Sequence, residues 1–191
     1  GPVREVHCWV EQGIEGPRSR PQESVPVPER FHWDLWLGPA PSRPYHPCYF
    51  EKRSLSWQNW WDFGNGTMSD LGSHFNDLPL WALQLHHPLT IEASGPPPHT
   101  EIAPASMQAT YEFGARGDLP PVRMTWYQGE NKPEIWTRKG CPQWSDGHLC
   151  IGDKGMLLSN YGQYQLLPEA TFADYQPPEP TLPRGKSHHA E

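Results

Sequence analysis

The chain has 191 residues, enough for one domain with a real core, and 22 acidic against 15 basic side chains give a formal net charge of −7. This acidic balance argues against nucleic acid or an anionic membrane surface as a partner. No stretch reaches the roughly 20 apolar residues that a membrane span requires. The 24 prolines and 17 glycines predict long ordered loops, whereas an aromatic content of 12%, with ten Trp, excludes disorder throughout the chain.

The first third of the chain combines one strand with long loops. Residues 3–10 form a strand-like run whose alternate side chains face opposite sides of a sheet. Residues 11–31 are polar and rich in proline and indicate a loop. A short aromatic helix or turn is expected at 31–37, closed by Gly38. Residues 39–50 contain four prolines, so neither regular helix nor central strand is expected there.

A longer helix is predicted within residues 67–86. Its apolar residues recur at spacings of three and four, the period of one helix face; they are Leu71, Phe75, Leu78, Ala82 and Leu85. Thr67 or Ser69 is a candidate cap at its start. Because Pro79 removes one backbone donor, we expect a kink or a restart near Asp77.

The remaining chain predicts six more strands and a proline-rich end. The strands are expected at 89–93, 107–113, 122–128, 148–151, 156–158 and 163–167. The sequence therefore predicts an α+β fold: an open, mostly antiparallel sheet with helices on one face and long Pro-rich loops. We expect a single domain over 1–191, with a loop-rich aromatic insertion at 11–66, the helix at 67–86, the sheet at 89–167 and a tail at 168–191. Residues 187–191 are typical of the first turn of a helix.

Three polar residues of the predicted helix carry the clearest chemistry. Asp70, His74 and Asp77 stand at i, i+4 and i+7 and share one helix face. A carboxylate one turn from an imidazole orients the ring and favours its protonated form, which is useful in acid–base catalysis. Spacing alone also fits a structural ion pair. The same three residues are a weaker candidate for a divalent metal site, because no second cluster supplies further ligands.

Aromatic residues before this helix suggest contacts to a sugar ring, which offers an apolar C–H face and hydroxyl groups. Most of these rings are expected in the core. The substrate-binding candidates are Arg43, Tyr45, His46, Trp60 and Trp61. The first three are polar groups in a segment whose proline content predicts that it lies outside the core.

Several of these motifs together resemble the C-terminal domain of the Gfo/Idh/MocA family, named after glucose–fructose oxidoreductase and inositol dehydrogenase. The motifs are Gly-Pro-Val-Arg-Glu-Val-His at 1–7, Trp-Asp-Leu-Trp-Leu-Gly-Pro-Ala-Pro at 33–41, Arg-Pro-Tyr-His-Pro at 43–47, Trp-Trp-Asp-Phe-Gly at 60–64 and Gly-Asp-Lys-Gly at 152–155, with Asp70, His74 and Asp77. The chain is similar over nearly its whole length to bacterial predicted dehydrogenases of this family.

The resemblance implies that two domains carry different parts of the function. An N-terminal Rossmann domain would bind NAD or NADP, and the present domain would supply a substrate platform and subunit contacts. His74 would exchange the proton of a substrate hydroxyl during hydride transfer, and Asp70 would hold that hydroxyl or the imidazole. Asp77 would serve the helix or the domain junction.

Two family features are missing from the sequence: the glycine-rich G-x-G-x-x-G turn, and the Glu-Lys-Pro motif whose lysine joins the Asp and the His. We therefore expect a chain truncated at both ends, inactive alone and without a bound cofactor or metal. The leading interpretation is the substrate-binding half of an NAD(P)-dependent oxidoreductase acting on a sugar, polyol or derivative. A redox-assisted glycosidase of the same family and a non-enzymatic carbohydrate-binding or assembly module are the alternatives. A homo-oligomer formed through the open sheet face is also expected.

Overall fold

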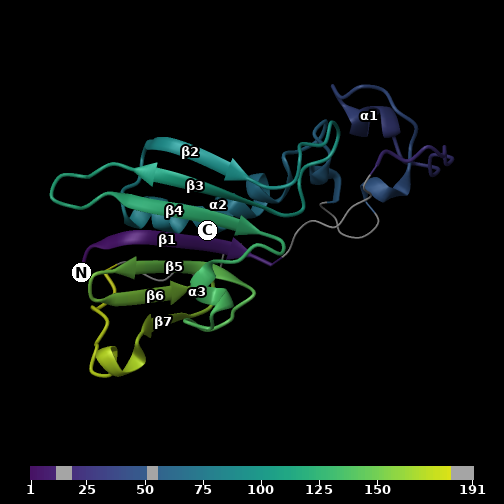
Figure 1. Cartoon of the computed structure of the whole chain (residues 1–191). Helices are drawn as coiled ribbons and strands as arrows, with labels where there is room; N and C mark the ends of the chain where they lie inside the picture. Colours follow the sequence, from purple (N-terminus) through teal and green to yellow (C-terminus); the bar gives the residue numbers. More distant parts are fainter. Residues whose placement is uncertain (12–18, 51–55, 182–191) are drawn as a thin grey trace.

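A seven-stranded sheet forms the body of the molecule in the computed structural model, which describes residues 1–11, 19–50 and 56–181. The strand order is β2-β3-β4-β1-β5-β6-β7 (Figure 1). The strands are β1 (Val3–Val10), β2 (Pro88–Ser94), β3 (Met107–Phe113), β4 (Val122–Gln128), β5 (Asp146–Gly152), β6 (Gly155–Ser159) and β7 (Tyr164–Leu167). All pairs are antiparallel except β1 with β4. The predicted α+β fold with an open, mostly antiparallel sheet is confirmed.

The central strand β1 shows how the sheet divides its two faces. Val6, Cys8 and Val10 alternate along the strand and belong to the main core, in which Phe75 of the long helix also lies. The intervening residues Glu5 and His7 point to the opposite face, because side chains alternate along a strand. The helix α2 (Gly66–Ala82) packs against β1, β4 and β5 and covers one face of the sheet.

The helix α2 differs from its predicted form in three details. It continues through Asp77 with Pro79 inside it, so the predicted restart there is wrong. Pro79 removes one backbone hydrogen bond from the helix, and its ring is fully buried. Neither Thr67 nor Ser69 caps the start, where Asn65 is the N-cap residue without a side-chain cap bond. The helix also ends at Ala82, earlier than predicted.

The predicted apolar face of α2 is partly wrong. Phe75 is buried and Leu71 packs against the core, but Leu78 is exposed. Leu80 and Leu83 pack against the core instead. Apolar side chains at the spacing of one helix face do not all point inward, because only part of this helix's circumference meets the sheet.

A separate lobe of short helices and loops extends from one end of the sheet (Figure 1). It contains α1 (Trp33–Leu37) and the 3₁₀ turns η1 (Pro47–Tyr49) and η2 (Ser56–Asn59). The short aromatic helix predicted near residue 33 is confirmed, and Gly38 ends it with φ 56°. Aromatic side chains build the core of this lobe, whose buried members are Trp33, Leu37, Tyr49 and Trp60.

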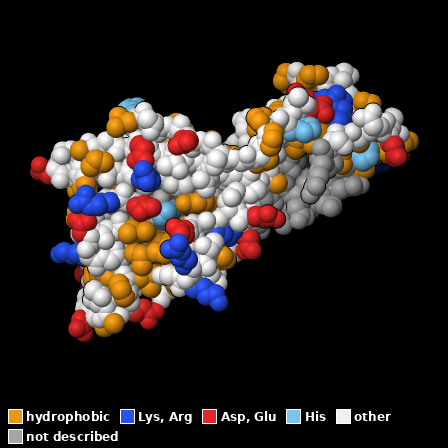
Figure 2. All heavy atoms as spheres, viewed as in Figure 1, with side chains coloured by type: hydrophobic (Ala, Val, Ile, Leu, Met, Phe, Trp, Pro, Cys, Tyr) orange, Lys and Arg blue, Asp and Glu red, His pale blue; other side chains and the backbone are white. Residues whose placement is uncertain are grey.

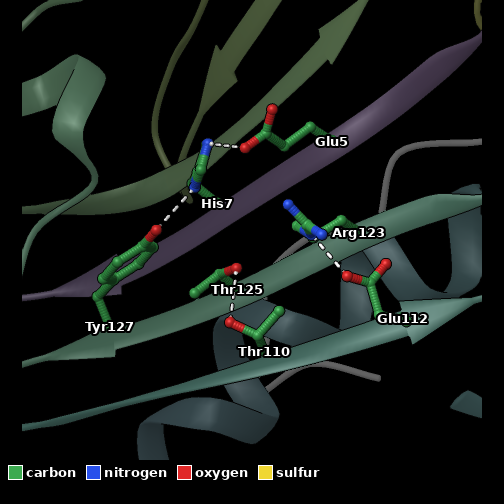
Figure 3. A network of polar contacts seen from close by, with 7 residues as sticks. All are labelled: Glu5, His7, Thr110, Glu112, Arg123, Thr125 and Tyr127. Atoms are coloured by element: carbon green, nitrogen blue, oxygen red, sulfur yellow. Dashed lines mark hydrogen bonds and ion pairs between the residues drawn. The ribbon is translucent and has the colours of Figure 1, made fainter. Parts of the chain in front are cut away.

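The face of the sheet opposite α2 is not bare. The helix α3 (Glu134–Thr137) lies over β5 and β6, where Ile135 and Trp136 pack with Trp9 and Leu149 in a second core cluster. Space-filling atoms show charged and apolar side chains mixed on this face (Figure 2). Over β1, β4 and β3 the face is polar (Figure 3). Arg123 pairs with Glu112 at 2.6 Å there, and the hydroxyls of Thr110 and Thr125 lie 3.2 Å apart.

The tail begins with the 3₁₀ turn η3 (Glu169–Phe172) after β7. The helical turn predicted at 187–191 lies outside the described residues. Among the residues that the structure does describe, no helix has the length and apolarity to cross a membrane.

Candidate functional site

Asp70 and His74 lie one turn apart on the first half of α2 and form the candidate site. His74 Nε2 is 3.9 Å from Asp70 Oδ1. This distance permits an ion pair but exceeds that of a hydrogen bond. The His74 side chain is 53% exposed, whereas that of Asp70 is 26% exposed. The imidazole therefore faces solvent, with the carboxylate set further back beside it.

A neighbouring turn holds the Asp70 carboxylate in place. Gln58, on η2, donates from Nε2 to Asp70 Oδ2 at 3.0 Å. Gly64 allows this turn to lie close, because a Cβ atom at Gly64 would come within 2.7 Å of the Gln58 Cα. One oxygen of Asp70 is thus occupied by an amide, and the other faces His74. The carboxylate is oriented before any ligand arrives.

The helix α2 begins at a point where its backbone lies close to Ala103. Gly66 has φ 73°, a region that favours glycine, and a Cβ there would lie 2.5 Å from the Ala103 side chain. Ala103 also donates its backbone N–H to the Asn59 carbonyl at 2.7 Å. The start of α2 is therefore fixed against the turn that carries Gln58.

Tyr161 is a third member of this region, and the sequence did not indicate it. It lies in the turn between β6 and β7, and its ring contacts the ring of His74 edge-to-face, with centroids 6.1 Å apart at 81°. It also contacts Phe75 at 5.3 Å. Partial burial raises the pKa of Tyr161, and the carboxylates of Asp146 and Asp70 raise it further.

The substrate-binding candidates lie in the aromatic lobe, with Arg43 buried in its core. Arg43 pairs with Asp62, and its guanidinium lies over the Phe63 ring at 4.8 Å. The side chain is 1% exposed, so the expectation that this segment lies outside the core is wrong for Arg43. The guanidinium of Arg43 is buried because it stacks on the Phe63 ring while it pairs with the more exposed Asp62.

The other candidates of the lobe differ in exposure. Tyr45 packs edge-on against Trp33 at 5.4 Å and is half-buried. His46 accepts the Cys48 N–H at 3.1 Å and thereby caps η1. Trp60 is fully buried. Trp61 is 41% exposed and donates its indole N–H to the His99 carbonyl at 2.9 Å.

Asp77 completes the helical triplet noted in the sequence. It is exposed on α2, one turn beyond His74. Within residues 1–11, 19–50 and 56–181, no group of three or more His, Cys, Asp or Glu side chains is arranged to hold a metal ion. The candidate site thus offers an exposed imidazole, an oriented carboxylate and a phenol.

The structure defines the class of the protein as an α+β domain with an open sheet and an aspartate–histidine pair on its long helix. Residues 15–119 match the oxidoreductase-family model for the C-terminal α/β domain of the Gfo/Idh/MocA proteins. The match covers more than half of the chain, and the chain belongs to this family. The matched residues include α2 with Asp70 and His74. No curated protein matches the chain.

Proposed function

We propose that this chain is the substrate-binding half of an NAD(P)-dependent oxidoreductase that acts on a sugar, polyol or derivative. Its family consists of oxidoreductases, and a C-terminal domain of this family accompanies an N-terminal domain. The single observation that carries the proposal within this chain is the exposed His74 imidazole next to the Asp70 carboxylate that Gln58 orients.

In this proposal, His74 accepts the proton of the substrate hydroxyl at Nε2. Oxidation of an alcohol to a carbonyl removes one proton from oxygen and one hydride from carbon. A base must be within hydrogen-bond reach of that hydroxyl, and the exposed imidazole of His74 can be reached by a substrate. Asp70 stabilises the imidazolium that forms, because its carboxylate is 3.9 Å from the same nitrogen.

The cofactor would be held outside this chain. NAD or NADP, bound by the N-terminal domain, would supply the hydride acceptor. The sequence contains no G-x-G-x-x-G turn. The one parallel pair, β1 with β4, is not followed by the glycine-rich turn of a dinucleotide-binding unit. Both observations support a cofactor site outside these residues, and we expect the isolated chain to be inactive.

The open face of the sheet, over β1, β4 and β3, is the surface that we propose for a second copy of the chain. Glu5, Glu112 and Arg123 place both signs of charge on this face. Charges of both signs permit self-complementary pairing across a two-fold axis. We therefore propose a homo-oligomer through this face, as part of the same functional assembly.

A non-enzymatic carbohydrate-binding module has less support, because the aromatic rings of the lobe serve mainly as its core. Trp33, Tyr49 and Trp60 are buried. A sugar-binding platform needs the faces of its rings in solvent. This observation favours the enzyme over the binding module.

The test is an activity screen of the complete protein, with its N-terminal domain, against a panel of polyols, sugars and glycosides. We expect net reduction of NAD⁺ or NADP⁺ with at least one polyol or sugar, and no turnover by the isolated 191-residue chain. Release of a sugar from a glycoside without net cofactor reduction would indicate the redox-assisted glycosidase instead. No turnover of any probe, or activity of the isolated chain, would contradict the proposal.

A further inference from the structure

We propose that Tyr161 is a substrate-contact residue of the site around His74, where its ring and hydroxyl receive a polyhydroxylated substrate. This inference rests on the proposed function. It adds to the site a side chain from a different part of the fold, the turn between β6 and β7.

Tyr161 lies beside His74. The Tyr161 ring meets the His74 ring edge-to-face, with centroids 6.1 Å apart. Tyr161 is therefore a direct neighbour of the imidazole that the substrate hydroxyl would reach. Phe75, the next residue on α2, also contacts Tyr161, with ring centroids 5.3 Å apart.

The turn that carries Tyr161 is held in a defined shape. Asn160 Oδ1 accepts the backbone N–H groups of Gly162 at 3.0 Å and Gln163 at 3.2 Å. The Asn160 backbone N–H also donates to the Gln163 carbonyl at 3.0 Å. Side-chain bonds of this kind fix a turn locally. Tyr161 is thus presented by an ordered turn rather than by a free loop.

Little of the Tyr161 side chain is buried. Tyr161 is 73% exposed although it is a large aromatic residue. Its contribution to the core is therefore small. Tyr164 and Tyr175 are also exposed, at 59% and 50%. Of these three exposed tyrosines, Tyr161 is the one whose ring contacts a residue of the candidate site.

The chemistry of the phenol suits a polyol or sugar. A tyrosine offers an apolar ring face for C–H groups and a hydroxyl that both donates and accepts hydrogen bonds. Partial burial raises the pKa of Tyr161, and the Asp146 and Asp70 carboxylates raise it further, so the phenol is protonated and can donate at neutral pH, as an ordinary tyrosine can. A substrate oxygen next to the reacting hydroxyl is the acceptor that fits this donor.

The experiment compares Tyr161→Ala and Tyr161→Phe with the matched control Tyr164→Ala in the complete protein. The substrate is the best polyol or sugar of the panel, and kcat and KM are measured separately, with thermal unfolding as a check of folding. We expect Tyr161→Ala to raise KM about tenfold or more with a smaller change in kcat, as expected for lost binding contacts. Tyr161→Phe should give an intermediate KM, and Tyr164→Ala should stay within about twofold.

The outcomes separate this inference from the proposed function. Wild-type turnover with an unchanged KM for Tyr161→Ala overturns the inference and leaves the proposed function standing. An equal loss for Tyr161→Ala and Tyr164→Ala overturns it as well, because the effect would not be specific to the site. Absence of wild-type turnover with every probe overturns the proposed function, and the inference with it.

Discussion

Arg43 illustrates how a charged side chain becomes part of a core. Its guanidinium pairs with Asp62 and lies over the rings of Phe63 and Tyr49, at 4.8 Å and 5.9 Å from their centroids. The Arg43 carbonyl accepts the indole N–H of Trp33 at 2.8 Å. The residue therefore ties two segments of the aromatic lobe together.

Replacing Arg43 by alanine should destabilise the protein by about 3 kcal/mol, because it removes a fully buried side chain that packs on the Phe63 and Tyr49 rings and leaves a cavity there. Unfolding by urea measures this loss. The control is Arg123→Ala, whose exposed pair with Glu112 should leave the free energy of unfolding almost unchanged. Equal effects of the two substitutions would contradict the assignment of Arg43 to the core.

The candidate site shows what the sequence reveals at the scale of residues. Asp70 and His74 were predicted because four residues in a helix make one turn, so sequence spacing fixes their proximity. Tyr161 was not predicted, because its contact with His74 depends on how β6 and β7 sit beside α2. The burial of Arg43 was missed for a similar reason. The Phe63 ring under its guanidinium and its ion-pair partner Asp62 come from another segment.

At the scale of elements, α2 ends in a Schellman motif that uses glutamine where glycine is usual. Gln84 has φ 55°. Its N–H donates to the Trp81 carbonyl at 3.2 Å, and the Leu85 N–H donates to the Leu80 carbonyl at 2.8 Å. Leu85 remains buried although it lies beyond the helix. This explains why its apolar spacing extended the predicted helix too far.

Replacing Gln84 by glycine should stabilise the protein by about 0.5 to 1 kcal/mol, because glycine adopts the left-handed conformation without steric cost. Thermal or urea unfolding gives the change. Gln84→Ala is the matched control and should bring no gain, because alanine keeps the Cβ atom. A gain with alanine as large as with glycine would contradict this explanation.

The seven strands were predicted because each is a short run of alternating or β-branched residues between turns. The helix α3 was not predicted, since four residues leave no periodic pattern. The parallel pairing of β1 with β4 depends on contacts between distant parts of the chain. Local patterns therefore indicate the elements, and long-range packing decides their arrangement.

For the molecule as a whole, two buried histidines on opposite faces of the sheet link stability to pH. His7 lies between Glu5, at 3.0 Å, and the Tyr127 hydroxyl, at 3.1 Å (Figure 3). Burial lowers the pKa of His7, although Glu5 raises it in part. Burial also lowers the pKa of His148, whose Nε2 lies 2.6 Å from the Ser159 hydroxyl.

The free energy of unfolding should therefore fall as the pH decreases from about 6.5, the ordinary histidine pKa. Below this pH the unfolded chain binds protons at both histidines, whereas the folded chain resists binding them, so protons favour unfolding. Urea unfolding between pH 7.5 and about 5.5 measures the slope, in a range that avoids most carboxylate titration.

Substitutions test whether His7 and His148 cause this change of the free energy of unfolding with pH. The double substitution of His7 and His148 by glutamine should reduce the slope, whereas His87→Gln, at an exposed position, should preserve it. A slope that is the same in the double variant and in the wild-type protein would contradict this account.

The central claim is that His74 moves a proton of the substrate, and the most direct measurement is kcat of His74→Ala beside kcat of Asp77→Asn in the complete protein. Both side chains are exposed on α2, so neither change should affect folding. We expect His74→Ala to lower kcat by about a hundredfold or more, the usual contribution of a general base, and Asp77→Asn to leave kcat within about twofold. A His74→Ala variant with wild-type kcat would contradict the account.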